Sequence, residues 1–288
     1  MNETHSNRAG QILTALGKSV AYLLLFLGSQ VLVSFAFTMA ITLIIGARTG
    51  AVNPLLVTLE LYDYLIHISM ISNLLVLAVL LVFFLARRRR PLQEVGLRPV
   101  PGQAAAGAAG AAPLLYAVIT LALSLLPTTW LQDYSQASAP LSNTGVLPFL
   151  SVALVAPVVE EVIFRGLIQS RLARALPGWP AVLLSALAFA LCHGQPVWMG
   201  YAFLLGLVLG IMAWRAGSIL PSVITHVVFN AIGQVLVLPG LAQLNGLVVL
   251  AVLLLAGLAL CLLARRGLAL LFLPSQPNEN KKEADPHV

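Results

Sequence analysis

The hydrophobic positions of this chain gather in long runs, separated by short polar or basic stretches. A helix needs about 20 apolar residues to cross the hydrocarbon core, because each backbone amide must be bonded within its own segment. About eight runs reach or approach that length. They lie at 19–46, 65–86, 104–126, 145–170, 179–195, 197–214, 217–238 and 245–264. The pattern predicts an all-α, polytopic membrane protein with about eight transmembrane helices.

The runs divide the chain into five parts. We expect a cytoplasmic N-terminal segment, three transmembrane helices, a group of helices with the candidate chemistry, a last transmembrane helix and a disordered cytoplasmic tail. These parts are 1–18, 19–126, 145–238, 239–264 and 265–288. The polar stretch 127–145 is expected to be the longest connection on the outer side.

The basic residues favour one orientation of these helices. Short cytoplasmic loops are rich in Lys and Arg, and with the N-terminus inside, most of the 16 basic residues fall on the inner side. Those on the inner side are Arg8, Lys18, Arg87, Arg88, Arg89, Arg90, Arg98, Arg171, Arg174, Arg215, Arg265, Arg266, Lys281 and Lys282. The outer side receives Arg48, and Arg165 falls inside the fourth run. The sequence predicts a multi-pass protein of the cell membrane with both termini in the cytoplasm.

The composition agrees with a lipid environment. Apolar residues make up 59% of the chain and charged residues 9%, whereas about a quarter of the residues of a soluble domain are charged. The net charge of +6 and the Arg87–Arg90 cluster could suggest nucleic acid. A basic cluster beside a span is more typical of a topology anchor near anionic lipid. We therefore expect the bilayer, and no nucleic acid, as a partner, and the oligomeric state stays open.

Small residues in the third and sixth runs predict close helix packing. Gly107 and Gly110 lie in an Ala-rich stretch, and Gly206 and Gly210 form a GxxxG pattern. Glycines at this spacing let two helix backbones approach each other. We expect the sixth helix to lie in the centre of the bundle.

Ionisable side chains inside the runs are the candidates for chemistry, because each costs at least about 2.5–3.5 kcal/mol to insert. The fourth run contains Glu160, Glu161 and Arg165. Residues four apart share a helix face, so Glu161 and Arg165 can pair and neutralise each other. Glu160 lies on another face, where a carboxylate needs a proton, a metal, a histidine or a polarised water. We expect Glu160 to be the base and the other two to be a supporting pair.

His193 ends the fifth run, and His226 and Asn230 share a face in the seventh. Either histidine alone is more typical of a hydrogen-bonded interior residue, but together with Glu160 they indicate a hydrolase. One carboxylate and two imidazoles can bind zinc and leave a position open for water. Alternatively, Glu160 and His193 activate the water while His226 and Asn230 stabilise the oxyanion of the tetrahedral intermediate. The sequence leaves both mechanisms open.

The depths of these residues predict a shared cavity. At about 1.5 Å per residue from the inner helix ends, His193 lies deepest and the others less deep. A cavity open to the cytoplasm is expected if the fifth helix starts late, tilts or breaks near Pro177 and Pro180. Pro157, just before the carboxylates, is expected to free backbone carbonyls.

The order Glu-Glu-x-x-x-Arg, Phe-x-x-x-His and His-x-x-x-Asn over about 145–235 resembles the CAAX protease and bacteriocin-processing family of membrane endopeptidases. Phe164-Arg165-Gly166 also fits this family, which is similar to CAAX prenyl endopeptidases of the Ras-converting-enzyme type. The resemblance implies a metalloendopeptidase with a peptide or protein substrate at the membrane. It implies that Glu160 and His193 activate water. His226 and Asn230 would bind metal or stabilise the oxyanion.

The resemblance also implies a divalent metal ion, with Zn²⁺ expected. Its ligands would come from the four residues Glu160, His193, His226 and Asn230. Whether the substrate carries a prenyl group stays open.

Two alternatives belong to other classes of protein. A transporter or proton relay also uses intramembrane Glu, Arg and His, although no inverted repeat is visible and the motifs gather in one half of the chain. A non-catalytic immunity or scaffold protein of the same fold is the other alternative.

Overall fold

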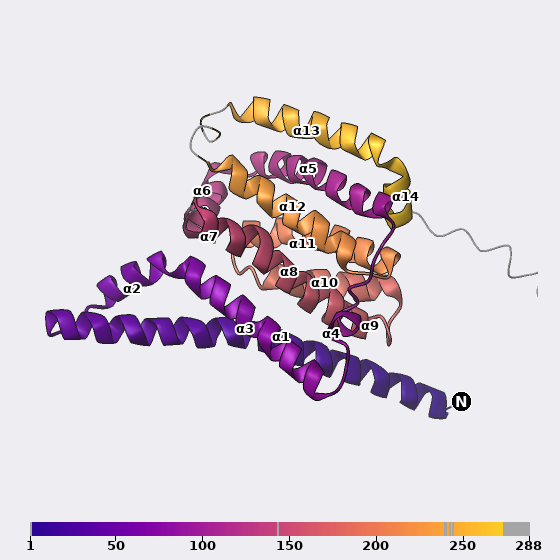
Figure 1. The fold of residues 1–288 in the computed structure, drawn as a ribbon, viewed down its shortest axis with the longest axis horizontal. Helices are drawn as coiled ribbons and strands as arrows, with labels where there is room; N and C mark the ends of the chain where they lie inside the picture. Colours follow the sequence, from indigo (N-terminus) through magenta and orange to yellow (C-terminus); the bar gives the residue numbers. More distant parts are fainter. Residues whose placement is uncertain (1, 143, 239–240, 242, 244, 273–288) are drawn as a thin grey trace, which may run out of the picture.

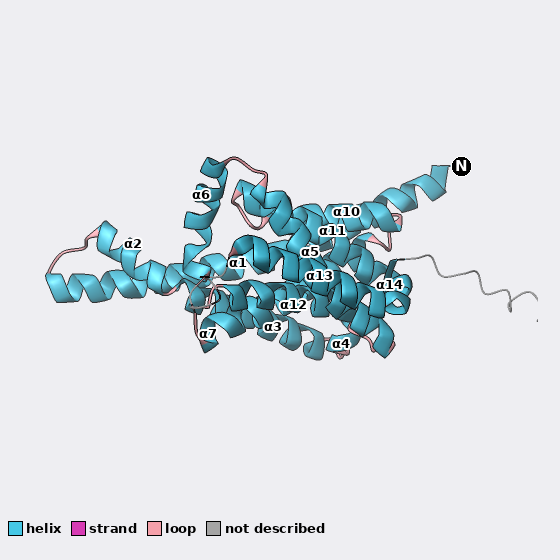
Figure 2. Ribbon diagram, turned by 90° about the horizontal axis from the view of Figure 1, so that it is seen from above, coloured by secondary structure: helices cyan, strands magenta, loops and turns pink. Residues whose placement is uncertain are grey.

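The computed structural model describes residues 2–142, 144–238, 241, 243 and 245–272, which form helices without any strand (Figures 1 and 2). The longer helices are α1 (Asn2–Thr49), α2 (Pro54–Asp63), α3 (Leu65–Ala86), α5 (Gly102–Ser124), α6 (Thr128–Ser138), α10 (Gly178–Leu191), α11 (Pro196–Ala216), α12 (Leu220–Leu236), α13 (Gly246–Leu263) and α14 (Arg265–Phe272). The shorter elements are α4 (Pro91–Glu94), η1 (Ala139–Leu141), α7 (Val146–Pro148), η2 (Phe149–Val155), α8 (Ala156–Glu161), η3 (Val162–Gln169) and α9 (Ser170–Leu172).

The helices agree with the predicted runs. Six are long and apolar enough to cross a membrane, at Arg8–Thr49, Leu65–Ala86, Gly102–Ser124, Val146–Leu172, Pro196–Ala216 and Gly246–Leu263. Two shorter apolar helices, Gly178–Leu191 and Leu220–Leu236, correspond to the fifth and seventh runs. The predicted all-α, polytopic fold is confirmed.

Two stretches that the sequence predicts as connections contain helices. The stretch after the first run contains α2, which packs back onto α1 through a buried cluster of Ile41, Ile45 and Val57. Its start is stabilised by the Asn53 side chain, which accepts from the amides of Leu55 and Leu56. The outer connection 127–145 contains α6. The hairpin formed by the end of α1 and by α2 projects beyond the bundle (Figure 1).

The C-terminal segment differs from the predicted disordered tail. Residues 265–272 form α14, which packs against α5. A methyl group at Gly267 would lie 1.7 Å from the Gln103 carbonyl oxygen, so the backbones are in direct contact. This contact depends on a glycine at that point, which hydropathy alone does not reveal. Residues 273–288 lie outside the described part of the chain.

The segment 146–172 lies at the centre of the bundle, with α10 and α12 packed against it. The side chains of Ile163, Phe164 and Leu167 are fully buried there. Helix α11 packs between α10 and α12, as the GxxxG pattern predicts. Two of its glycines, Gly206 and Gly210, are buried at these contacts.

The bundle has two chemically different ends (Figure 1). The N-terminus of α1, α4, α9 and α14 lie at one end, which we call the Arg-rich end. It is defined by Arg87–Arg90, Arg171, Arg174, Arg215, Arg265 and Arg266. The opposite end carries α2, α6 and α7, and we call it the α6 end.

Candidate active site

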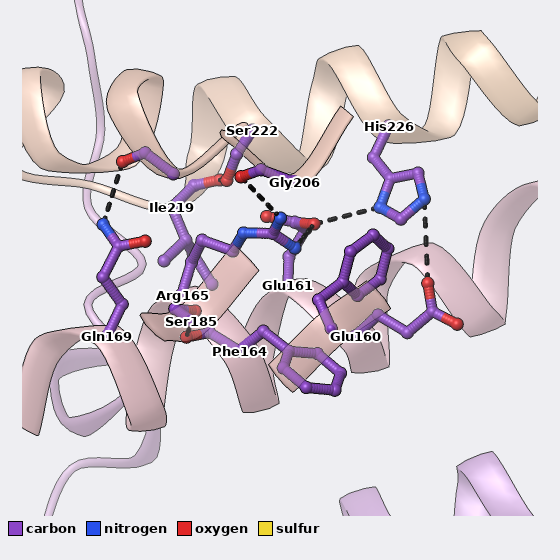
Figure 3. Close-up of polar contacts among 12 residues, drawn as sticks. Glu160, Glu161, Phe164, Arg165, Gln169, Ser185, Gly206, Ile219, Ser222 and His226 are labelled. Atoms are coloured by element: carbon purple, nitrogen blue, oxygen red, sulfur yellow. Dashed lines mark hydrogen bonds and ion pairs between the residues drawn. The ribbon is translucent and has the colours of Figure 1, made fainter. Parts of the chain in front are cut away.

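The predicted pair of Glu161 and Arg165 is present in the structure. Arg165 Nη1 donates to Glu161 Oε1 at 2.7 Å, and both side chains are fully buried. His226 contacts the same carboxylate oxygen through Nδ1, at 3.0 Å (Figure 3). An ionised carboxylate only accepts hydrogen bonds, so this contact places a proton on Nδ1 of His226. In the neutral ring, Nε2 then keeps its lone pair.

Glu160 lies on the other face of α8, as the helical geometry predicts. Its Oε2 lies 3.6 Å from His226 Nε2 (Figure 3), and 18% of its side chain is exposed, in contrast to 0% for Glu161. An ionised Glu160 and the Nε2 lone pair are both acceptors, which repel each other unless something lies between them. A proton, a water molecule or a cation would satisfy both atoms.

His193 follows the end of α10 in a turn, where its amide donates to the Ala190 carbonyl. Its Nδ1 lies 2.9 Å from the Phe189 carbonyl oxygen, which is an acceptor, so Nδ1 carries the proton. The ring packs against Phe189 and Trp198, with centroids 4.8 and 5.3 Å away. Both histidines are thus oriented through Nδ1 and leave Nε2 available.

Asn230 binds the backbone beside the site. Its Nδ2 donates to the Val152 carbonyl oxygen at 3.0 Å. Val152 lies in η2, a π-helix, where a carbonyl pairs with the amide five residues later. For Val152 that residue is Pro157, which has no N–H. The side chain of Asn230 replaces the missing donor, which agrees with the expectation that Pro157 frees a carbonyl.

Two side chains of η3 bind carbonyls on α11. Arg165 Nη2 donates to Gly206 at 3.0 Å, and Gln169 Nε2 donates to Gly210 at 2.8 Å (Figure 3). Ser185 of α10 donates to the Phe164 carbonyl at 2.8 Å. Sequence reasoning missed Gln169 and Ser185. The spacing of four residues between Arg165 and Gln169 was the available signal, because it places both on the face toward α11.

One cavity of about 630 Å³ brings four of the six predicted site residues together: Glu160, His193, His226 and Asn230 line it. Glu161 and Arg165 do not line it and lie behind His226. The site is therefore built in two layers, with the ion pair buried behind the groups that face the cavity.

Aromatic residues line much of the same cavity, and sequence reasoning missed them. Tyr116, Tyr134, Trp198 and Tyr201 are among its lining residues. Tyr134 comes from α6, and its hydroxyl lies 3.4 Å from that of Tyr201. A single aromatic residue in an apolar helix usually belongs to the core, so the sequence held no signal for this wall.

The donor atoms suit a divalent ion in their chemistry. Glu160 Oε2 and His226 Nε2 are 3.6 Å apart, close to the separation of about 3.3 Å between two ligands of one tetrahedral zinc ion. Second-layer hydrogen bonds orient both imidazoles, as is usual for metal-binding histidines. However, the described residues contain no group of three His, Cys, Asp or Glu side chains placed to hold a metal. The structure therefore assembles two donors, while His193 and Asn230 share the cavity.

Comparison with known proteins gives one match, over residues 142–232. The matching family model is described as type II CAAX prenyl endopeptidase Rce1-like. We call residues 142–232 the Rce1-like segment. No curated protein and no solved structure matches the chain.

The Rce1-like segment contains all six predicted site residues and most of the central helices. The resemblance to the CAAX protease family is confirmed over this segment, and at family level the match supports a CAAX-protease-like intramembrane endopeptidase. The chain before residue 142 and after residue 232 lies outside the match. Part of the cavity wall, including Tyr116 and Tyr134, comes from outside the Rce1-like segment.

Proposed function

We propose that this protein is an intramembrane endopeptidase that hydrolyses peptide bonds with water activated by Glu160 and His193. One observation carries the proposal. Glu160, His193 and His226 come from three separate elements and line one cavity, and each histidine has its Nδ1 engaged and its Nε2 available. Groups oriented in this way are typical of hydrolytic sites.

Glu160 is the general base in this mechanism. Its carboxylate accepts a proton from a water molecule while the water oxygen attacks the peptide carbonyl carbon. His193 Nε2 accepts a hydrogen bond from the other O–H of that water and orients it. The carbonyl oxygen becomes an oxyanion. The oxyanion then collapses, the C–N bond breaks and Glu160 returns its proton to the leaving amine nitrogen, so each hydrolysed bond consumes one water molecule.

In this mechanism His226 and Asn230, which line the same cavity, stabilise the oxyanion. The Glu161 carboxylate holds Nδ1 of His226, so the Nε2 edge of the ring faces the cavity, where an Nε2–H group would donate to the oxyanion. The Asn230 amide is held against the Val152 carbonyl, which limits its freedom to turn. Preorganised donors stabilise developing charge without having to rearrange during the reaction.

A divalent ion, proposed to be Zn²⁺, would be held by donors from Glu160, His193, His226 and Asn230. It would polarise the peptide carbonyl and make a bound water more acidic. The opposed acceptors of Glu160 and His226, 3.6 Å apart, support a cation at this point.

Peptide cleavage by the purified full-length protein in detergent tests the proposal. The substrates are quenched fluorescent peptides with and without a C-terminal prenyl group. Glu160→Gln and His193→Ala should each abolish cleavage. His67→Ala is the matched control, because it removes an imidazole of α3 that is not among the cavity-lining residues. Cleavage that persists in Glu160→Gln would contradict the assignment of the base.

A further inference from the structure

The cavity occupies one half of the bundle. In each helix that contributes to it, the lining residues lie near the α6 end or in the middle. From α5, for example, it is lined by Tyr116, Ile119, Thr120 and Leu123, in the half of the helix that ends at Ser124. Helix α12 contributes Gly233, Gln234 and the following Val237, at the same end.

The connection 125–145, which contains α6 and η1, forms the part of the cavity nearest the α6 end. Tyr134 and Ser138 of α6 and Ser142 after η1 are lining residues. Gln234 Nε2 donates to the Leu141 carbonyl at 3.0 Å, which ties this connection to α12. The cavity thus extends from the candidate catalytic groups to a segment outside the long apolar helices.

The opposite side of the site is closed. Beyond His226, toward the Arg-rich end, lie the buried side chains of Glu161, Arg165 and Gln169. Thr225 and Met212 fill the adjacent space between α11, α12 and α5, and both are fully buried. No residue of the Arg-rich end defined above is among the cavity-lining residues in the described part of the chain.

The charges of the connections favour one orientation. The connections at the α6 end, 50–64, 125–145, 192–195 and 237–245, contain no Lys or Arg, and Arg48 in the last turn of α1 is the basic residue beside them. The connections at the Arg-rich end include Arg87–Arg90, Arg98 and Arg174. Short loops with many Lys and Arg residues stay in the cytoplasm, so the α6 end faces the other side of the membrane.

We propose that the active site is reached from the non-cytoplasmic side of the membrane, and that its substrates are peptide segments presented at that face. The statement about substrates rests on the proposed function, whereas the side of access rests only on the position of the cavity and the charges of the connections. It differs from the cytoplasmic opening that helix depth alone suggests.

The cavity wall further defines the substrate. Its described lining residues include no Lys, Arg or Asp, and Glu160 is its one acidic member. The remaining polar groups are mainly hydroxyls and amides, and Tyr116, Tyr134, Trp198 and Tyr201 supply apolar surface with polar edges. Such a wall favours an uncharged, partly apolar segment, because burying an unpaired charge there would be costly.

Thiol labelling in intact cells tests the side of access. The background carries Cys192→Ser and Cys261→Ser, and single cysteines are introduced as Ser138→Cys, with Ser142→Cys as a second position, and Arg174→Cys at the opposite end. A further variant, Cys261→Ser alone, keeps Cys192, which lines the cavity beside His193. The probe is a small, charged methanethiosulfonate that does not cross membranes, and the readout is the mass of the purified full-length protein.

We expect Ser138→Cys, Ser142→Cys and Cys192 to be modified in intact cells, and Arg174→Cys only after the cells are permeabilised. Thermal unfolding in detergent shows that each variant is folded. Modification of Cys192 or of both α6-end cysteines only after permeabilisation overturns the proposal.

Cleavage in detergent separates this inference from the proposed function, because a protein in a detergent micelle can be reached by the substrate from both ends. If Glu160-dependent cleavage occurs in detergent while the labelling pattern is reversed, only the side of access is wrong. If labelling is as expected but Glu160→Gln still cleaves peptides, the proposed base is wrong and the side of access stands.

Discussion

His226 and Glu161 meet inside the bundle, with Nδ1 and Oε1 3.0 Å apart and both side chains almost completely buried. The residues are 65 positions apart in the chain. This contact orients the imidazole so that Nε2 points to Glu160 (Figure 3). Two adjacent glutamates therefore have different tasks, one that holds the histidine and one that faces the cavity.

The two glutamates should differ in their effect on stability. Glu161→Gln leaves Arg165 without its buried countercharge, and breaking such a pair costs about 3–5 kcal/mol. Glu160→Gln should change the free energy of unfolding far less, while it abolishes peptide cleavage. Equilibrium unfolding in mixed detergent micelles measures both variants. Equal stability of the two variants would contradict the two-layer description of the site.

Asn230 and Pro157 should be energetically coupled. Asn230→Ala removes the donor to the Val152 carbonyl, and a buried polar group left unpaired costs about 1–3 kcal/mol. In a Pro157→Ala background this cost should fall, because residue 157 regains an N–H that can pair with the backbone. A double-mutant cycle on the free energy of unfolding measures the coupling. An identical cost in both backgrounds would show that Asn230 does not replace the missing donor.

Gly206 and Gly210 of α11 should not tolerate a methyl group. A Cβ at Gly206 would lie 3.2 Å from Arg165 Nη2, and one at Gly210 would lie 2.8 Å from Gln169 Oε1. We expect Gly206→Ala and Gly210→Ala each to lower the free energy of unfolding by about 1–3 kcal/mol, as overpacking does.

Gly200 provides the control on the same helix, because a methyl group at this position would meet no neighbouring atom within 4 Å. Gly200→Ala should be neutral or stabilising by up to about 1 kcal/mol, since alanine favours the helix. A loss of stability at Gly200 as large as that at Gly210 would point to the helix backbone rather than to the contacts with η3.

A divalent ion should bind at the site. Atomic emission on protein purified after zinc loading should detect the metal, and Glu160→Gln and His226→Ala should lower the bound amount, whereas His67→Ala should not. Chelation should stop peptide cleavage, and added zinc should restore it. Full cleavage by metal-free protein would rule out the ion and favour the mechanism in which Glu160 and His193 activate the water while His226 and Asn230 stabilise the oxyanion.

Pattern and spacing in the sequence were enough to predict the long apolar helices and the local pairing of charges. Runs of about 20 apolar residues predict spans because a backbone in hydrocarbon must satisfy its own hydrogen bonds. The Glu161–Arg165 pair follows from a spacing of four on one helix. Both depend on neighbours in the chain, so pattern and spacing were sufficient. The family motifs placed Glu160, His193, His226 and Asn230 among the candidates in the same way.

The tertiary structure alone decided which groups meet and where the cavity lies. His226 could have faced either glutamate, and the Asn230–Val152 bond joins residues 78 positions apart. The tyrosines of the wall come from α5, α6 and α11, and the cavity extends toward the α6 end. These features depend on how helices distant in sequence are rotated and shifted against one another. That arrangement is determined by the packing of side chains between the helices. The apolar runs of the sequence do not predict it, because each face of an apolar helix is compatible with lipid.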